Sequence, residues 1–446
     1  MMNILKGEML RIYIGLFFLL CIINLNAAEL SFPFQIPAHG KGLELSNANI
    51  IFSPTAMAFD SQNRPYIINN RNPKTYGKLA TIRNGEWIVF PLDDVGGLKE
   101  RNMHAQGEIV IDDNDCIYIR IGSKLIYSPD LGESFQVLNV KGSLELRTCQ
   151  SSFSHPPAVC QISEISYVDR AKKKSKEMAW WAQSGKFSIY LPEKNKHGIT
   201  LGKPLKVSDN CLAAGSGGHS GGTSFAVTIG NYTHFVYAEV PKNVRTGGNP
   251  IYIATADRQQ RKISKKTFLL IAPPKKTDNH TRPTITADSQ GYLHVLSGSH
   301  GEPFYYIKSK KPNDITGGWT KPVRLTGRQC YASIVCDKND SLHTVFREWL
   351  PHASLGYSFK DSISNHWTKP KTLVVGSNKK GKYEYGIFYH RLFIDRHSNL
   401  YLSFTFFEFK TAKNGDYPEV LIVSEDQGRT WKLADKKFFI RAKLEK

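Results

Sequence analysis

The chain has 446 residues and a formal net charge of +20, from 59 Lys and Arg against 39 Asp and Glu. A field of this sign attracts polyanions, but no Walker loop, zinc-ribbon spacing or RNA-binding aromatic signature accompanies it. The composition therefore gives no support to a nucleotide- or nucleic-acid-binding class. It leaves two interpretations of the charge, which are binding of acidic polysaccharides and a merely soluble basic surface.

The first 28 residues are typical of a cleavable signal peptide. Lys6 and Arg11 precede the apolar run IYIGLFFLLCIINL, and small residues follow at Ala27 and Ala28. The run is too short for a comfortable membrane span, and no later stretch reaches the roughly 20 apolar residues that a span needs. We expect a secreted or periplasmic protein without stable membrane insertion, with residues 29–446 as a single domain. A retained N-terminal anchor is the alternative.

A strand–turn–strand unit with an Asp-x-x-Gly/Asn turn recurs along the rest of the chain. This pattern predicts β-hairpins, and a repeat of about 50–65 residues suits four strands and their loops. The copies span residues 55–68, 107–120, 223–238, 283–298, 332–347 and 391–404, with a looser copy at 159–182.

Two of the units also contain the Asp-box pattern Ser-x-Asp-x-Gly-x-x-aromatic, in SPDLGESF (128–135) and SEDQGRTW (424–431). In this pattern the Asp satisfies backbone donors of a tight turn and the Gly adopts a strained dihedral. The aromatic residue packs between sheets. The boxes and the seven repeats predict an all-β fold, a seven-bladed β-propeller. The N-terminal segment ELSFPFQIP is expected to complete the last blade, and a pair of β-sandwiches is the competing fold.

Six cysteines follow the signal peptide, and none forms a CxxC pair. A chain of this length does not depend on disulfides, so we expect most of them to be buried thiols. A Cys149–Cys160 bridge in an oxidising compartment stays open.

Two neighbouring hairpins place chemically active residues at their open ends. His280 and His300 flank the hairpin in NHTRPTITADSQGYLHVLSGSH (279–300), and Tyr331 and Arg347 flank the next one. Nearly equal arms about each turn bring both ends to the same rim. Other histidines stand at or just before an inner strand, so a ring of imidazoles is expected at one mouth of the channel: His104, His155, His219 and His390.

This set of residues suits β-elimination on a uronic acid. It contains no pair of carboxylates for glycoside hydrolysis. Arg347 offers a bidentate fork for the sugar carboxylate, whose binding acidifies the C5 proton. His is a base near neutral pH, and the Tyr hydroxyl can protonate the departing O4 oxygen. We expect a neutral His as base and Tyr331 as acid, and the opposite use of Tyr stays open.

The chain resembles the seven-bladed propeller polysaccharide lyases typified by ulvan lyases, within the BNR-4 repeat proteins. The resemblance lies in DNHTRPTITADSQGYLHVLSGSHGEPFYYIKSKKP (278–312) and CYASIVCDKNDSLHTVFRE (330–348). It implies that His280, His300, Tyr331 and Arg347 are the catalytic cluster. The chain departs from the family's pattern at Thr281, where the family has Asn, and at Glu348 and Trp349. The resemblance therefore supports the reaction type better than ulvan as the substrate.

The expected protein is a monomeric lyase without cofactor or metal, acting on an acidic polysaccharide and not on nucleic acid. Arg347, His219 and His390 are the expected substrate-binding residues. A non-catalytic propeller that binds acidic glycans is the first alternative, and it does not need the histidines and Tyr331 together. A sialidase-like hydrolase is the second, but the chain has no Arg-Ile-Pro start and seven repeats instead of six.

Overall fold

The structure is a computed structural model that describes residues 56–434. Gaps in the description fall at residues 70–77, 93–107, 122, 141–142, 147–153, 168–182, 213–223, 245, 350–352, 365, 376, 380–381 and 409–418. Every helix-or-strand element within the described residues is a β-strand. The described residues contain no helix with the length and apolar character of a membrane span. The expected signal peptide, ELSFPFQIP, Cys149, His104 and His219 lie outside the described residues.

The first four sheets follow one another along the chain and are antiparallel. The first contains β1 (Ala56–Phe59), β2 (Pro65–Asn69), β3 (Lys78–Arg83) and β4 (Glu86–Pro91). The second contains β5 (Glu108–Ile111), β6 (Ile117–Ile121), β7 (Lys124–Ser128) and β8 (Gln136–Asn139). The third contains β9 (Ser143–Glu145), β10 (Val159–Tyr167), β11 (Gln183–Tyr190) and β14 (Leu205–Leu212), with a separate hairpin of β12 (Glu193–Asn195) and β13 (Gly198–Thr200). The fourth contains β15 (Ala226–Ile229), β16 (Tyr232–Ala238), β17 (Asn249–Asp257), β18 (Lys262–Ile263) and β19 (Thr267–Ala272).

Three further antiparallel sheets complete the described chain. The fifth contains β20 (Thr284–Ala287), β21 (Leu293–Leu296), β23 (Tyr305–Lys308) and β24 (Val323–Arg324). The sixth contains β22 (His300–Glu302), β25 (Gln329–Cys336), β26 (Leu342–Glu348), β27 (Leu355–Lys360) and β28 (Lys371–Val374). The seventh contains β29 (Ser377–Lys379), β30 (Lys382–Ile394), β31 (Leu400–Glu408), β32 (Glu419–Ser424) and β33 (Lys432–Leu433).

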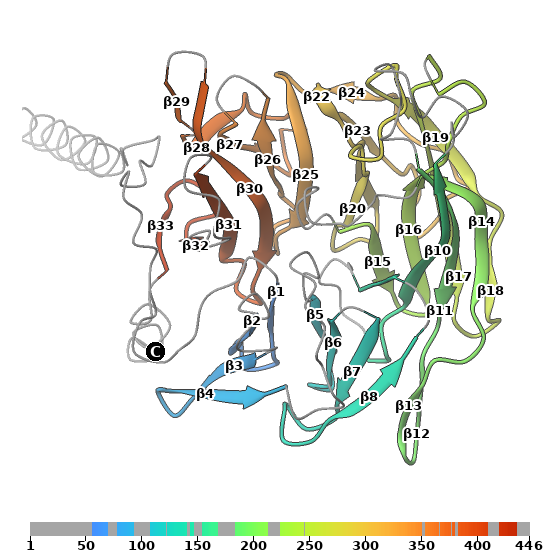
Figure 1. Ribbon diagram of the computed structural model, residues 1–446, viewed down its shortest axis with the longest axis vertical. Helices are drawn as coiled ribbons and strands as arrows, with labels where there is room; N and C mark the ends of the chain where they lie inside the picture. The colour runs from blue at the N-terminus through green and yellow to red at the C-terminus, as the bar shows by residue number, and fades with distance from the viewer. Residues whose placement is uncertain are drawn as a thin grey trace, which may run out of the picture.

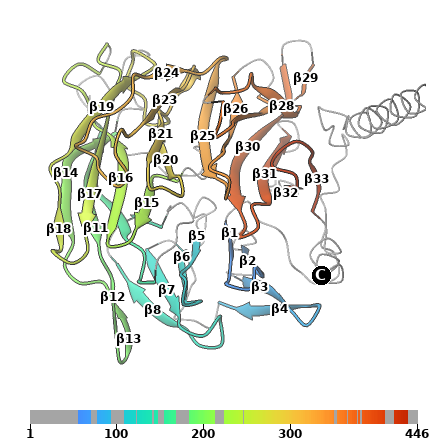
Figure 2. The ribbon, with the colours of Figure 1, turned by 180° about the vertical axis from the view of Figure 1, so that it is seen from behind.

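The sheets surround a common central space (Figures 1 and 2). Strands β1, β5, β15, β20, β25 and β30 lie toward the centre, and the later strands of each sheet lie toward the periphery. A cavity of about 950 Å³ lies between these central strands and the turns that follow them. Six of the repeats found in the sequence are the hairpins that begin at these strands.

The looser repeat at 159–182 differs from the prediction. Its first part is β10, which is the second strand of its sheet, because β9 at Ser143–Glu145 pairs with it on one side and β11 on the other. The apolar run of β10 resembles an inner strand in sequence. The actual first strand has only three residues and gives too short a pattern to recognise.

Buried apolar clusters join each sheet to its neighbours. One cluster joins the last sheet to the first, with the rings of Phe59 and Tyr401 5.0 Å apart. Others join the first to the second, the second to the third, the third to the fourth and fifth, the fifth to the sixth, and the sixth to the seventh. The core is therefore distributed around the centre, between sheet faces that are apolar on both sides.

The repeated turns have a common hydrogen-bond pattern that explains the Asp-x-x-Gly/Asn sequence. The carboxylate of the first turn residue accepts hydrogen bonds from the backbone N–H groups two and four residues later in four of them: Asp60, Asp112, Asp337 and Asp395. The residue three positions after the Asp has a positive φ of 59–70°. Gly, Asn and Asp adopt this conformation most readily. The recurring turn sequence therefore follows from the positive φ that the turn requires at this position.

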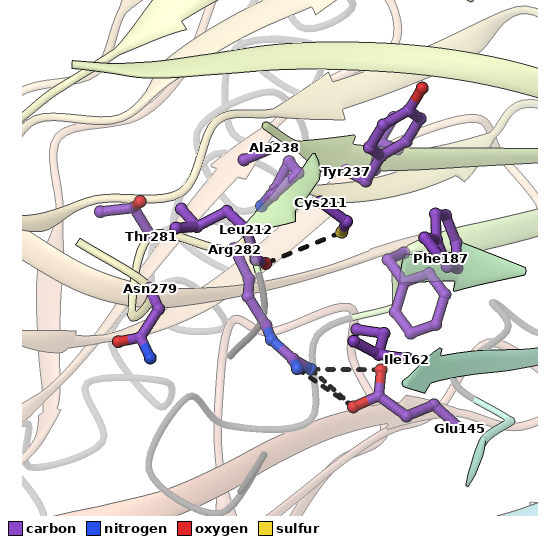
Figure 3. Close-up of a pocket in the computed structure, with 13 residues that line it drawn as sticks. Glu145, Ile162, Phe187, Cys211, Leu212, Tyr237, Ala238, Asn279, Thr281 and Arg282 are labelled. Atoms are coloured by element: carbon purple, nitrogen blue, oxygen red, sulfur yellow. Dashed lines mark hydrogen bonds and ion pairs between the residues drawn. The ribbon is translucent and has the colours of Figure 1, made fainter. Parts of the chain in front are cut away.

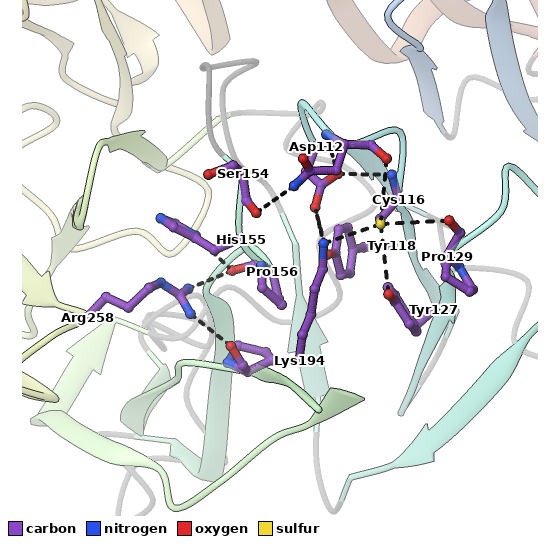
Figure 4. A network of polar contacts seen from close by, with 12 residues as sticks. Asp112, Cys116, Tyr118, Tyr127, Pro129, Ser154, His155, Pro156, Lys194 and Arg258 are labelled. Atoms are coloured by element: carbon purple, nitrogen blue, oxygen red, sulfur yellow. Dashed lines mark hydrogen bonds and ion pairs between the residues drawn. The ribbon is translucent and has the colours of Figure 1, made fainter. Parts of the chain in front are cut away.

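In the second sheet, the turn aspartate Asp112 also contacts the β12–β13 hairpin (Figure 4). The Asp112 carboxylate accepts a hydrogen bond from the Tyr118 hydroxyl and one from Lys194 of the hairpin, at 2.9 Å and 3.0 Å. The Lys194 ammonium also lies 3.3 Å from the Cys116 sulfur. Cys116, Cys160, Cys211 and Cys330 are buried free thiols, as expected, and Cys336 is a half-buried one. Cys160 therefore does not form the bridge to Cys149 that the sequence left open.

Both Asp boxes connect the last two strands of a sheet, β7 to β8 and β32 to β33. In the first, Asp130 accepts hydrogen bonds from the backbone and the hydroxyl of Ser134. The aromatic residue of each box contacts the neighbouring sheet: Phe135 lies 6.5 Å from Phe90, and Trp431 lies 5.8 Å from Tyr357, between ring centroids. The boxes are thus structural elements of the periphery.

Candidate active site

The local path of the chain brings the two predicted hairpins into contact. After β21 the chain leaves the fifth sheet, and β22 pairs with β25 of the sixth sheet. His300 pairs with Cys330, and Cys330 pairs with Arg347 on the next strand. His300, Cys330 and Arg347 therefore lie in one row across three adjacent strands, with Tyr331 next to its middle member.

The four predicted catalytic residues form one cluster. The rings of His280 and His300 are stacked with centroids 4.8 Å apart, and the Tyr331 ring lies 6.2 Å and 5.8 Å from them. The Arg347 guanidinium carbon lies 4.7 Å from the centre of the Tyr331 ring. The His280 and His300 side chains are 14% and 18% exposed, whereas Tyr331 and Arg347 are buried. The imidazoles therefore form the accessible part of the cluster.

Asp278, a site residue that the sequence reasoning missed, holds both histidines. One carboxylate oxygen lies 2.6 Å from His280 Nδ1, and the other lies 2.7 Å from His300 Nδ1. An ionised carboxylate only accepts hydrogen bonds, so each Nδ1 carries a hydrogen, and in the uncharged form of either ring Nε2 is the nitrogen that can accept a proton. Burial opposes ionisation of Asp278, but the hydrogen bonds from the two histidines outweigh it and hold its pKa well below the usual range.

The segment that carries His280 is anchored by an ion pair between Arg282 and Glu145. Arg282 lines a small pocket, where its guanidinium lies 3.0 Å from the Glu145 carboxylate (Figure 3). Both side chains of the pair are about 10% exposed, at 11% and 9%. This ion pair therefore fixes the path of the chain just before β20. Because Glu145 belongs to β9, it also holds the segment of His280 against the third sheet.

Tyr331 lies at an irregularity of β25. Its φ is +63°, and the register shifts between Cys330 and Ser333. Such a backbone is rare for a bulky residue and costs about 1–3 kcal/mol, while a bulge re-aims a side chain out of the regular alternation. His390 of the seventh sheet secures the irregularity, since its Nε2 lies 2.7 Å from the Tyr331 carbonyl oxygen.

Burial acts in opposite directions on the pKa values of Arg347 and Tyr331. Burial disfavours the charge of Arg347, but Cys330 and Tyr331 outweigh it and the pKa of Arg347 lies above its usual value. Burial raises the pKa of Tyr331, although the neighbouring Arg347 opposes the shift. Arg347 Nε lies 3.3 Å from the Cys330 sulfur. The site therefore combines a permanent cation with a protonated phenol.

Two of the other predicted histidines, His155 and His390, lie within the described residues. His390 is fully buried, and burial lowers its pKa to about 4. Its contact with the Tyr331 carbonyl oxygen gives it a positioning role beside the cluster. His155 Nε2 lies 2.9 Å from the carbonyl oxygen of Gly230, in the turn between β15 and β16. That is the turn end of a hairpin, opposite the open ends where His280 and His300 lie.

Asp278, His280 and His300 also gather three groups that can ligate a metal, with their ligand atoms within 4.8 Å of one another. The hydrogen bonds already engage both carboxylate oxygens and both Nδ1 atoms. While the two Nδ1 atoms donate these hydrogen bonds they cannot also ligate a metal ion, and a typical zinc site takes three or four protein ligands. The arrangement suits acid–base chemistry better than metal binding.

Part of the chain is similar to a known protein family. Residues 249–438 match the model of the BNR repeat-containing family (BNR_4). The chain is also similar to a curated protein, the ulvan lyase of Alteromonas sp. (strain LOR), with 30% identity over 113 residues. The match covers 20% of this chain and 23% of the relative, so the chain spans about a quarter of the relative's length. The resemblance seen in the sequence is confirmed to this extent.

Solved structures give weaker matches. An ulvan lyase of the polysaccharide lyase class, bound to -[GlcA(1-4)Rha3S]-, is 16% identical, with a TM-score of 0.41 and coverage of 50% of this chain and 56% of that one. A Penicillium chrysogenum α-L-arabinanase is 10% identical, with a TM-score of 0.39 and coverage of 83% and 92%.

Proposed function

We propose that this protein is a polysaccharide lyase that cleaves a uronic-acid-containing, ulvan-like polysaccharide by β-elimination. The observation that carries the proposal is the pair of histidines bridged by Asp278, in contact with Tyr331 and next to Arg347. The similarity to an ulvan lyase over 113 residues supports the same activity. The partner is an acidic polysaccharide and not nucleic acid, and the protein acts as an exported monomer.

The proposed fold is a seven-bladed β-propeller formed by residues 29–446. Seven sheets of four or five strands and the buried clusters that join the last described sheet to the first support it. In this fold the open ends of the hairpins β20–β21 and β25–β26 meet at one mouth of the channel. An experimental structure with six or eight blades, or with two separate sheet domains, would contradict it.

Each residue of the cluster has a role in the proposed reaction. Arg347 binds the uronate carboxylate and stabilises the negative charge that develops on it when the C5 proton leaves. The Nε2 of His280 or His300 takes that proton, because Asp278 keeps Nδ1 protonated. Tyr331, whose pKa is raised, gives its proton to O4. The C4–O4 bond breaks as the C4–C5 double bond forms, which leaves an unsaturated uronate at the new end.

The test is incubation with ulvan, pectic, alginate and glycosaminoglycan substrates, followed by ultraviolet absorbance. Only elimination creates a double bond conjugated with the carboxylate, so hydrolysis or simple binding gives no signal. Net charge of +20 also suits a non-catalytic protein that binds acidic glycans. That second candidate predicts binding without any absorbance change on all four substrates.

Substitutions then test the assignment of roles. Arg347→Lys keeps the charge but loses the planar fork, and it should reduce kcat/KM by about 10²-fold or more with the fold intact. Tyr331→Phe should abolish turnover but spare binding, because it removes only a proton-transfer group. Near wild-type rates in both variants of an active lyase would show that the chemistry lies elsewhere.

A further inference from the structure

Trp349 borders the proposed catalytic cluster at the end of β26. Its ring lies edge-on against His300, with centroids 4.7 Å apart and an interplanar angle of 84°. The side chain is half-buried. Its backbone N–H donates to the carbonyl oxygen of Arg328, at 2.9 Å. The reaction proposed above uses the histidine, but it gives no role to this indole.

Gly301 and Arg328 hold the indole in place. Gly301 has a φ of +91°, and a Cβ at this position would lie 2.9 Å from the indole of Trp349, so only glycine permits the contact. Arg328 Nε donates to the Gly301 carbonyl oxygen at 2.9 Å, and its guanidinium lies 5.9 Å from the centre of the Trp349 ring. Segments before β25, within β22 and after β26 therefore meet at one fixed point beside His300.

Arg328 keeps hydrogen-bonding capacity for a ligand. The residue is exposed. Only its Nε has a hydrogen-bond partner among the described residues, so its Nη groups can donate to another molecule. A guanidinium presents paired donors that match a carboxylate or a sulfate. An aromatic ring beside it supplies apolar surface for the C–H groups of a sugar, at low cost in side-chain entropy.

We propose that Trp349 and Arg328 form a sugar subsite next to the reacting uronate, which binds a neighbouring sugar that carries an anionic group. The inference rests on the proposed lyase function for the position of the reacting sugar. The indole contacts the sugar ring, and Arg328 binds its sulfate ester or carboxylate.

The experiment measures binding by calorimetry, with ulvan oligosaccharides and the same oligosaccharides after chemical desulfation. The variants are Arg328→Gln, Trp349→Phe and Trp349→Ala, and Arg324→Gln is the matched control. Arg324 is also exposed and basic, and it pairs with Tyr305 on the β24 edge of the fifth sheet. Arg328→Gln should weaken binding about tenfold, as expected for a lost charged contact. The control should change it less than twofold.

The two probes distinguish the source of the anion. If Arg328 binds a sulfate, the effect of Arg328→Gln disappears on desulfated oligosaccharides, and if it binds a carboxylate, the effect persists. Trp349→Ala should weaken binding of both probes, and Trp349→Phe should do so less. Binding of both probes at wild-type affinity by Arg328→Gln and Trp349→Ala would overturn the subsite. If the wild type produces no elimination but the Arg328 and Trp349 variants still bind more weakly, the lyase function is contradicted and the subsite is not.

Discussion

Asp278 binds two imidazoles at once, and this sharing decides which nitrogen of each ring carries the hydrogen. The sequence reasoning found both histidines because they flank a hairpin symmetrically. It did not use the carboxylate two residues before His280, although Asp278 stands in the same short stretch and its Oδ1 also accepts the His280 backbone N–H at 2.9 Å. The missed signal was an Asp in front of one of two paired histidines.

Asp278→Asn should lower kcat by about 10²-fold or more, since the base is a positioned proton acceptor. The amide is isosteric, but its N–H₂ donates where the carboxylate accepted. The histidine opposite that group must then present Nδ1 as acceptor and carry its hydrogen on Nε2, where no base is left. Steady-state kinetics should show the loss in kcat with KM nearly constant. A kcat close to wild type in a folded variant would exclude the orienting role.

His390 gives stability a defined pH dependence. Burial lowers its pKa to about 4, whereas an unfolded histidine titrates near 6.5. Between these values the unfolded chain binds a proton that the folded chain does not, so stability is complete above pH ~6.5 and is lost as pH falls toward ~4. The total loss is about 3 kcal/mol. No described residue accepts a hydrogen bond from its Nδ1, so no such contact offsets the cost of protonating the buried ring.

The measurement is denaturant unfolding of the wild type and of His390→Gln at several pH values. The Gln side chain keeps an N–H for the Tyr331 carbonyl but does not titrate. The variant should lose about 3 kcal/mol less than the wild type between pH 7 and pH 4. Parallel curves for the two proteins would show that His390 is not the group responsible.

At the scale of elements, a chain of hydrogen bonds connects an inner turn to an Asp box on the next sheet. Asp337 contacts His343 Nε2, His343 Nδ1 contacts the Tyr357 hydroxyl, and that hydroxyl contacts the carbonyl oxygen of Gln427. The sequence predicted the turn and the box separately. It could not predict their connection, because the link depends on how two sheets face each other.

Gly428 of that box should tolerate no side chain. Its φ is +82°, and a Cβ would overlap the Tyr357 hydroxyl. Gly85 is the matched control, with a φ of +85° and nothing within 4 Å of its Cβ position. Gly85→Ala should cost about 1–2 kcal/mol from backbone strain alone. Gly428→Ala should cost about 2 kcal/mol more, because the overlap displaces a buried hydroxyl from its partners. Equal losses in urea unfolding would show that the link to Tyr357 carries no stability.

At the scale of the whole molecule, repetition made the hairpins predictable but not the contact between the first and last described sheets. Strand–turn–strand units with a fixed Asp gave six hairpins, since each unit satisfies its own turn locally. The first strand of the third sheet was missed because only three residues, Ser143–Glu145, form it. The contact between the first and last sheets joins residues more than 300 positions apart, such as Asn63 and Asp395. No local pattern specifies such a contact.

Asn63 contributes polar contacts to this junction between the first and last described sheets. Its amide nitrogen donates to Asp395 Oδ2 at 3.0 Å, and its amide oxygen accepts the Arg396 backbone N–H at 2.9 Å. Asn63→Asp is isosteric and suits the same positive φ, but it replaces the donor with a second carboxylate oxygen facing Asp395. We expect a loss of about 1–3 kcal/mol from the unpaired carboxylates.

Asn84→Asp is the control for Asn63→Asp, because Asn84 has a φ of 53° and lies exposed in the β3–β4 turn. It makes the same change of charge and backbone preference away from any junction, so it should alter stability by less than about 0.5 kcal/mol. Hydrogen exchange should locate the effect of Asn63→Asp in β1, β2, β30 and β31. Equal losses of stability in the two variants, or exchange that rises evenly over all sheets, would show that the junction does not depend on the Asn63 contact. The apolar cluster around Phe59 and Tyr401 would then hold the first and last sheets together.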